Sequence, residues 1–155
     1  MKTIVVSGER SGIGKTYLAE RLLKNLRGWS ALKVTVARAG ACQSVKNCGL
    51  CRTVKDPFEI IRDERVIKQS KKDTARLKAA GAKEVIWLRA RPQGLRKGLK
   101  KALAQFSKCP GIVIEGTSVL KFLKPDLNFH VYPDSAYVVY RSKDELGKKW
   151  DVSLI

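Results

Sequence analysis

The chain has 155 residues, of which 44% are hydrophobic, and its formal net charge at pH 7 is +18. This length is typical of one compact domain with a real core, and no apolar run is long enough to span a membrane. The short apolar stretch after Lys2 is needed as a first strand, which argues against a signal peptide. We therefore expect a cytoplasmic protein with no membrane association, whose cysteines are reduced or bind metal. The positive charge suits polyanions such as nucleic acid, but no known nucleic-acid-binding module accompanies it, and a solvated basic surface is the simpler interpretation.

The strongest signal lies in residues 7–16, where a glycine-rich loop ends in Gly-Lys-Thr. An apolar run precedes it and a helical pattern over residues 17–26 follows it, which is the context of a phosphate-binding P-loop. Lys15 is expected to reach the β- and γ-phosphates of a nucleotide, and the Thr16 hydroxyl to ligate Mg²⁺. The expected nucleotide-binding residues of the loop are Gly8, Arg10, Ser11, Gly12, Ile13, Gly14, Lys15, Thr16 and Tyr17.

The spacing of the loop departs from the usual pattern by one residue. In G-x-x-x-x-G-K-[ST] the first glycine would fall on Glu9, whereas here it is Gly8. This spacing resembles the variant loops of dethiobiotin synthetase and Mrp/MinD-type proteins, and Arg10 stands where MinD-type members carry a second, signature lysine. A chance Gly-Lys-Thr in an ordinary turn is disfavoured, because position, flanks and spacing agree.

The remaining hydrophobic patterns alternate between strands and helices. Strands are expected at residues 2–7, 32–36, 84–88, 111–116, 128–132, 136–140 and 151–155, and helices at 17–26, 71–82 and 95–106. Residues 57–68 show no clean period, and we interpret them as an irregular linker with short helical pieces. Asp73 or Thr74 is expected to cap the helix over 71–82. This alternation predicts a three-layer α/β P-loop NTPase fold: a mainly parallel sheet flanked by helices, with antiparallel strands toward the C-terminus, all in a single domain over residues 1–155.

Glu115 ends the strand at residues 111–116, which is buried on both faces if the sheet is parallel. An acidic residue at the tip of such a strand is where P-loop proteins hold Mg²⁺ directly or through water. Glu115 is therefore the predicted second Mg²⁺ residue beside Thr16, the alternative being an exposed glutamate at a strand end.

A cysteine-containing insertion loop is expected at about residues 38–58, following the second strand. Cys42, Cys48 and Cys51 form a C-x5-C-x2-C pattern, which can present thiolates to zinc or to an iron–sulfur cluster. A fourth ligand is missing, because Cys109 should lie at the opposite edge of the sheet and His130 falls inside a strand. A redox thiol pair and plain reduced loop cysteines remain alternatives.

Several of these pieces together resemble the molybdopterin-guanine dinucleotide biosynthesis protein B family, over residues 1–132. They are the P-loop, the segment Lys72-Asp73-Thr74-x-Arg76 followed by Ala-Gly-Ala, and a Val-Ile-Glu-Gly strand end. The resemblance implies a GTP-binding, often homodimeric accessory protein with weak hydrolysis that assists molybdenum cofactor maturation. By position, it assigns phosphate and Mg²⁺ binding to Gly12, Gly14, Lys15 and Thr16, Mg²⁺ support to Glu115, and a place near the nucleotide or the cofactor-facing surface to Asp73 and Arg76.

The sequence departs from the family pattern in two places, which concern the molecule that the protein handles and the base of the nucleotide that it binds. Arg38 and the cysteine loop stand where family members usually carry a Lys-His-x-His-His-like segment, and no clear N-K-x-D guanine motif is present, so ATP stays open beside GTP. The predicted catalytic set is Lys15, Glu115 and Arg10, the last acting across a dimer as an arginine finger. The alternative functions are a metallochaperone NTPase that uses the cysteine loop, a small-molecule kinase with Asp73 as its acid, and a nucleic-acid binder.

Overall fold

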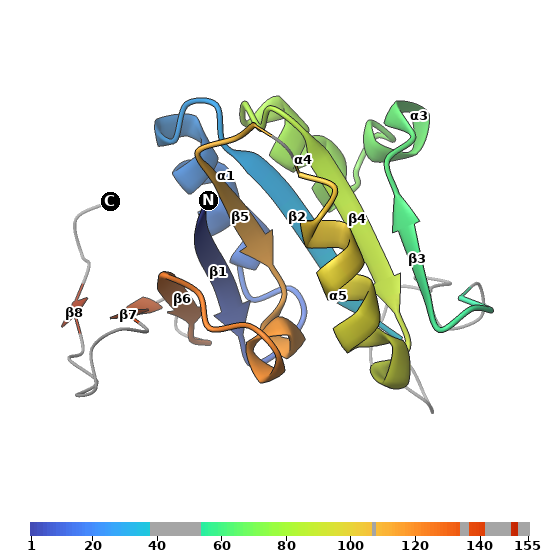
Figure 1. Cartoon of the computed structure of the whole chain (residues 1–155). Coiled ribbons are helices and arrows are strands. Elements are labelled where there is room, and N and C mark those ends of the chain that lie inside the picture. Colours follow the sequence, from blue (N-terminus) through green and yellow to red (C-terminus); the bar gives the residue numbers. More distant parts are fainter. Residues whose placement is uncertain (38–53, 107, 134–136, 142–149, 152–155) are drawn as a thin grey trace.

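The computed structural model, shown in Figure 1, describes residues 1–37, 54–106 and 108–133, and the backbone of 137–141 and 150–151. Within these residues the strands form one sheet in the order β3-β4-β2-β5-β1-β6-β7-β8. Its strands are β1 (Lys2–Gly8), β2 (Ser30–Val36), β3 (Phe58–Ile61), β4 (Val85–Ala90), β5 (Gly111–Glu115), β6 (Leu127–Val131), β7 (Tyr137–Arg141) and β8 (Trp150–Asp151). The central five, from β4 to β6, are parallel to one another.

Antiparallel strands stand at both edges of this sheet. At the C-terminal edge β7 pairs with β6 and β8 pairs with β7, so antiparallel strands lie toward the C-terminus as the sequence predicts. Of the strand expected at 151–155, residues 152–155 lie outside the described residues. At the other edge β3 pairs with β4, so the interpretation of residues 57–68 as an irregular linker is wrong for its first part. The reason is tertiary: Phe58 and Ile60 pack on the core beneath a helix, although their segment has no clean two-residue period.

Helices cover the two faces of the sheet. They are α1 (Lys15–Asn25), α3 (Glu64–Ile67), α4 (Asp73–Ala79) and α5 (Leu95–Leu103), with short 3₁₀ turns η1 (Pro92–Gly94) and η2 (Thr117–Lys121). Figure 1 shows α5 in front of the sheet and α1 and α4 behind it. Each face has its own core cluster, because alternate strand residues point to opposite sides: Val113 packs with α1 and α4, while Ile112 and Ile114 pack with α5.

The start of α4 differs from the predicted cap. The N-cap residue is Lys72, whose side chain makes no capping hydrogen bond. The Thr74 hydroxyl instead donates to the Ile67 carbonyl at 2.9 Å, which ties α4 to α3. Asp73 is turned toward the sheet, where it has an ion-pair partner described below.

The predicted cysteine loop falls largely on residues 38–53, so Cys42, Cys48 and Cys51 lie outside the described residues. Where the chain is described again, Val54 is buried and its carbonyl accepts two hydrogen bonds from the Arg91 guanidinium. Cys109 precedes β5 at the amino edge of the parallel strands, as predicted. None of the helices in the described part of the chain has both the length and the apolar character needed to cross a bilayer.

Candidate functional site

The glycine loop, residues 8–14, joins β1 to α1 and needs its glycines for two separate reasons. Gly12 and Gly14 have φ angles of +79° and +103°, in the left-handed region that favours glycine. A Cβ on Gly8 would lie 3.0 Å from the Val131 carbonyl oxygen and 3.1 Å from Ile13 Cγ2. The close approach of the Val131 carbonyl of β6 and of the Ile13 side chain therefore favours glycine at residue 8.

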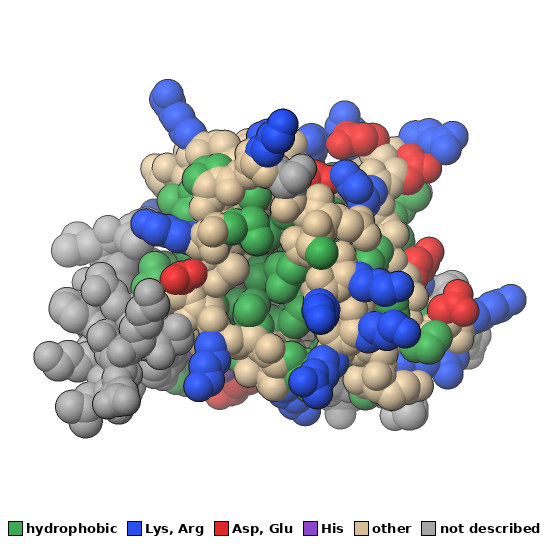
Figure 2. All heavy atoms as spheres, viewed as in Figure 1, with side chains coloured by type: hydrophobic (Ala, Val, Ile, Leu, Met, Phe, Trp, Pro, Cys, Tyr) green, Lys and Arg blue, Asp and Glu red, His purple; other side chains and the backbone are tan. Residues whose placement is uncertain are grey.

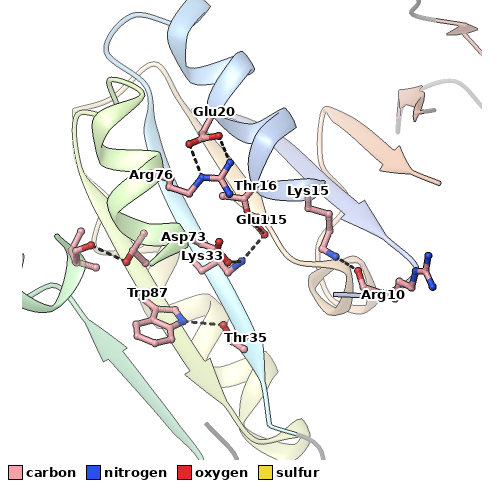
Figure 3. A network of polar contacts seen from close by, with 12 residues as sticks. Arg10, Lys15, Thr16, Glu20, Lys33, Thr35, Asp73, Arg76, Trp87 and Glu115 are labelled. Atoms are coloured by element: carbon pink, nitrogen blue, oxygen red, sulfur yellow. Dashed lines mark hydrogen bonds and ion pairs between the residues drawn. The ribbon is translucent and has the colours of Figure 1, made fainter. Parts of the chain in front are cut away.

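The loop opens directly into α1, with Gly14 as the N-cap and no side-chain cap. The first-turn N–H groups of a helix have no partner within the helix, and they favour an anion at this end. The Lys15 ammonium donates to the Arg10 carbonyl at 2.5 Å, so it is held on the loop itself. Burial lowers the pKa of Lys15, and the nearby Lys33 charge adds to this, while Glu115 and Asp73 oppose it. Arg10 is exposed, and Figure 3 shows its guanidinium turned away from the other site residues.

Glu115 is fully buried rather than exposed at its strand end, with 2% of its surface accessible. Its Oε1 accepts a hydrogen bond of 2.9 Å from the Thr16 hydroxyl. Its Oε2 is buried and has no hydrogen-bond partner among the described residues. Thr16 and Glu115, predicted as the Mg²⁺ pair, are thus brought together between α1 and β5, and one buried carboxylate oxygen is left to coordinate something else.

Lys33 is the residue of this site that sequence reasoning missed. It lies in β2 directly beside Glu115 in the parallel register, and its ammonium contacts Glu115 Oε1 at 2.5 Å and Asp73 Oδ2 at 2.7 Å. Burial alone would lower the pKa of Lys33, but the charges of Glu115 and Asp73 and their hydrogen bonds raise it on balance. The sequence did contain a sign of this role: Lys33 lies in the middle of a strand expected to be covered on both faces, where a charged side chain needs a partner.

Asp73, at the start of α4, completes the cluster from the helical layer (Figure 3). Burial opposes ionisation of its carboxyl, but the charge and hydrogen bond of Lys33, with smaller help from Thr16 and Arg76, lower its pKa on balance. Arg76 lies one turn further along α4, and its guanidinium makes two hydrogen bonds to Glu20 of α1, at 2.9 and 2.6 Å. The structure therefore places Asp73 in the site and Arg76 at its border, where it joins α4 to α1.

The donor set suits a hard divalent cation such as Mg²⁺. The two carboxylates of Asp73 and Glu115, the latter with one buried oxygen that has no partner among the described residues, and the Thr16 hydroxyl supply the oxygen ligands that this cation prefers. The described residues hold no group of three or more His, Cys, Asp and Glu side chains able to bind a metal. The remaining ligands would have to be phosphate oxygens and water, as is common for Mg²⁺ beside phosphates.

The other predicted loop residues have different surroundings. Ile13 packs into the core, so only its backbone is available to a ligand, whereas Ser11 is exposed and Tyr17 is 60% exposed on the first turn of α1. On the β6 side of the loop, His130 lies within a strand, as predicted, and its Nδ1 is 2.9 Å from the buried Ser7 hydroxyl.

Comparisons with known proteins add nothing to this geometry. No family model matches the chain, and neither a curated protein nor a solved structure resembles it significantly.

Proposed function

We propose that the chain is a Mg²⁺-dependent nucleotide-binding protein with the P-loop NTPase fold, taking GTP or ATP and hydrolysing it weakly. One observation carries this proposal: the Thr16 hydroxyl at the start of α1 meets the buried Glu115 at the end of β5, directly behind a glycine loop with positive φ angles. That pairing of loop and strand-end acid is what phosphate and Mg²⁺ binding in this fold requires.

The chemistry needs little more than placement of charge. The N–H groups of the loop and of the first turn of α1 bind phosphate oxygens. Lys15 brings a positive charge to the β- and γ-phosphates of the nucleotide. Mg²⁺, held by Thr16 and Glu115, supplies neutralisation of the phosphate charge when bound. Arg10 is exposed and points outward, which fits a role across a homodimer as an arginine finger. That role is refuted if Arg10→Ala hydrolyses nucleotide at the wild-type rate under dimeric conditions.

The test is a calorimetric titration with GTP and with ATP, each with Mg²⁺, on wild type, Lys15→Ala and Lys24→Ala. Lys24 is the matched control, because it is an exposed lysine in the last turn of the same helix. We expect binding to wild type and Lys24→Ala and its loss in Lys15→Ala. Absence of binding to wild type, or equal binding to all three proteins, would refute the proposal.

We further propose that the protein, in its nucleotide-bound form, has an accessory role in molybdenum cofactor maturation. The support is the Lys72-Asp73-Thr74-x-Arg76 segment, whose Asp73 reaches the site and whose Arg76 borders it. A titration of molybdopterin guanine dinucleotide, followed by pterin fluorescence with and without Mg²⁺-GTP, tests this role. If the fluorescence does not change while GTP binds, the cargo is different and nucleotide binding stands.

A second candidate function is nucleic-acid binding by the outer face of α5. Residues 85–114 contain seven lysines and arginines and no acidic residue. Leu95, Gly98, Leu99 and Ala102 face the sheet, while the basic residues Arg96, Lys97, Lys100 and Lys101 are exposed, and Figure 2 shows lysine and arginine side chains gathered over this helix. Binding to RNA or DNA without nucleotide, weakening steeply with salt and lost in a Lys97→Ala, Lys100→Ala, Lys101→Ala variant, would support it.

A further inference from the structure

We propose that Lys33 is a cation built into the chain that stands in the place of the divalent metal when no nucleotide is bound, so that metal enters the site only together with phosphate. This inference rests on the proposed function, because it concerns the same carboxylates. It assigns to Lys33 a gating role that the glycine loop and the Thr16–Glu115 pair do not provide.

The position of the ammonium is the first observation. It touches one oxygen of each of two carboxylates, 2.7 Å from Asp73 Oδ2 and 2.5 Å from Glu115 Oε1. The Thr16 hydroxyl donates to that same Glu115 oxygen. Lys33 Nζ therefore lies among the protein oxygens that would coordinate a metal, as Figure 3 shows.

Burial makes this position exclusive. The side chain of Lys33 is 15% exposed and that of Glu115 is 3% exposed, so water screens the two charges poorly. An ammonium and a divalent cation cannot both contact Glu115 Oε1 without strong repulsion at short range. Glu115 Oε2 belongs to the same carboxylate, so a divalent cation on that oxygen would also lie close to the Lys33 ammonium, and metal binds weakly until Lys33 moves away from Glu115.

Asp73 provides the place for the displaced ammonium. Its side chain is 45% exposed and is carried by α4, so Lys33 can keep this contact while it gives up Glu115. The phosphates of a nucleotide add negative charge beside Lys15 and Lys33, which compensates for placing a second cation here. Without phosphate, the negative charges of Glu115 and Asp73 are already balanced by Lys33 and the nearby Lys15, so the net attraction for a divalent cation is weak and Lys33 keeps the site closed to metal.

The first experiment measures Mn²⁺ binding by electron paramagnetic resonance in the complete absence of nucleotide, on wild type, Lys33→Gln and Lys72→Gln. Glutamine keeps a hydrogen-bond donor for the carboxylates but removes the charge. Lys72 is the matched control: it is the neighbour of Asp73, and its ammonium lies 5.9 Å from the centre of the Trp87 ring. We expect Lys33→Gln to bind Mn²⁺ about tenfold or more tightly than the other two proteins, since removing a buried like charge favours the metal.

Equal Mn²⁺ affinity in wild type and Lys33→Gln would overturn the inference. An equal gain of Mn²⁺ affinity in Lys33→Gln and Lys72→Gln would also overturn it, because the gain would then come from the lower net charge of the protein and not from the position of Lys33. The measurement contains no nucleotide, so its failure is separate from failure of nucleotide binding. If Lys33→Gln does not fold, the inference is tested on wild type by nuclear magnetic resonance of the ¹⁵N-labelled lysine side chains. The Lys33 ammonium signal should shift on addition of Mg²⁺ with nucleotide and stay unchanged with Mg²⁺ alone; any other pattern overturns the inference.

Discussion

The two faces of the sheet differ in where they keep their charges. On the α5 face the strands and the helix meet through apolar side chains, and the lysines and arginines of α5 point outward. On the α1 and α4 face Lys33 and Glu115 lie inside the packed layer, where Lys33 forms ion pairs with both Glu115 and Asp73. Burying charge is costly unless it is paired, so its presence on one face marks the face where chemistry is expected.

The largest expected effect is on the buried charge cluster. Lys33→Met should lower the free energy of unfolding by about 3–5 kcal/mol, because it leaves the buried Glu115 carboxylate without its cation. Urea denaturation measures this, with Lys72→Met as control. A loss below about 1 kcal/mol, the value for surface pairs, would mean that the cluster is hydrated and that the contrast between the faces is false.

The α5 face should respond to packing alone. Leu99 is 3% exposed, and Leu99→Ala should lower the free energy of unfolding by about 2–5 kcal/mol through lost burial and the cavity left behind. Nucleotide affinity, measured by calorimetry at a temperature where the variant is folded, should stay at the wild-type value. A parallel loss of affinity would show that the two faces are not independent.

The Thr16 hydroxyl links stability to metal binding. Thr16→Ala removes a buried hydrogen bond to a charged oxygen and should cost about 1.5–3 kcal/mol in the free energy of unfolding. It should also weaken Mg²⁺-dependent nucleotide binding, whereas Thr16→Ser, which keeps the hydroxyl, should retain most of both. Unchanged Mg²⁺ dependence in Thr16→Ala would remove this residue from the proposed metal site.

The contribution of Asp73 should depend on pH in a defined direction. Its folded-state pKa lies below its ordinary value of 3.8, so its stabilising effect is present above pH 3.8 and is lost as the pH falls through the folded-state pKa. The free-energy difference between wild type and Asp73→Asn should therefore be steady from neutral pH down to about 4 and shrink below it. An increase on acidification would contradict the Lys33–Asp73 pairing.

The smallest effect is expected where the cluster meets solvent. Arg76 and Glu20 join α4 to α1, but their side chains are 46% and 19% exposed, so water and salt weaken the pair. A double-mutant cycle with Arg76→Ala and Glu20→Ala should give a coupling energy of about 0.2–1 kcal/mol. A coupling energy of about 3 kcal/mol, the size of the loss expected for Lys33→Met, would mean that this pair belongs to the buried charge cluster.

Much of this protein follows from its sequence, because the relevant signals are local. Periodicity predicted α1, α4, α5 and the parallel strands, and the glycine loop with Thr16 and Glu115 was identified from spacing and from its place at strand ends. Steric limits on φ and the alternation of strand residues act within a few positions, so a sequence displays them directly.

The tertiary structure decided the rest. The strand at Phe58–Ile61 forms because β4 offers a free edge, and glycine is favoured at residue 8 because β6 approaches it closely. Lys33 became part of the site only when β2 was placed beside β5 and under α4, which brought carboxylates 40 and 82 residues away to its ammonium. Partners at such separations are chosen by packing, and no pattern within β2 itself specifies them.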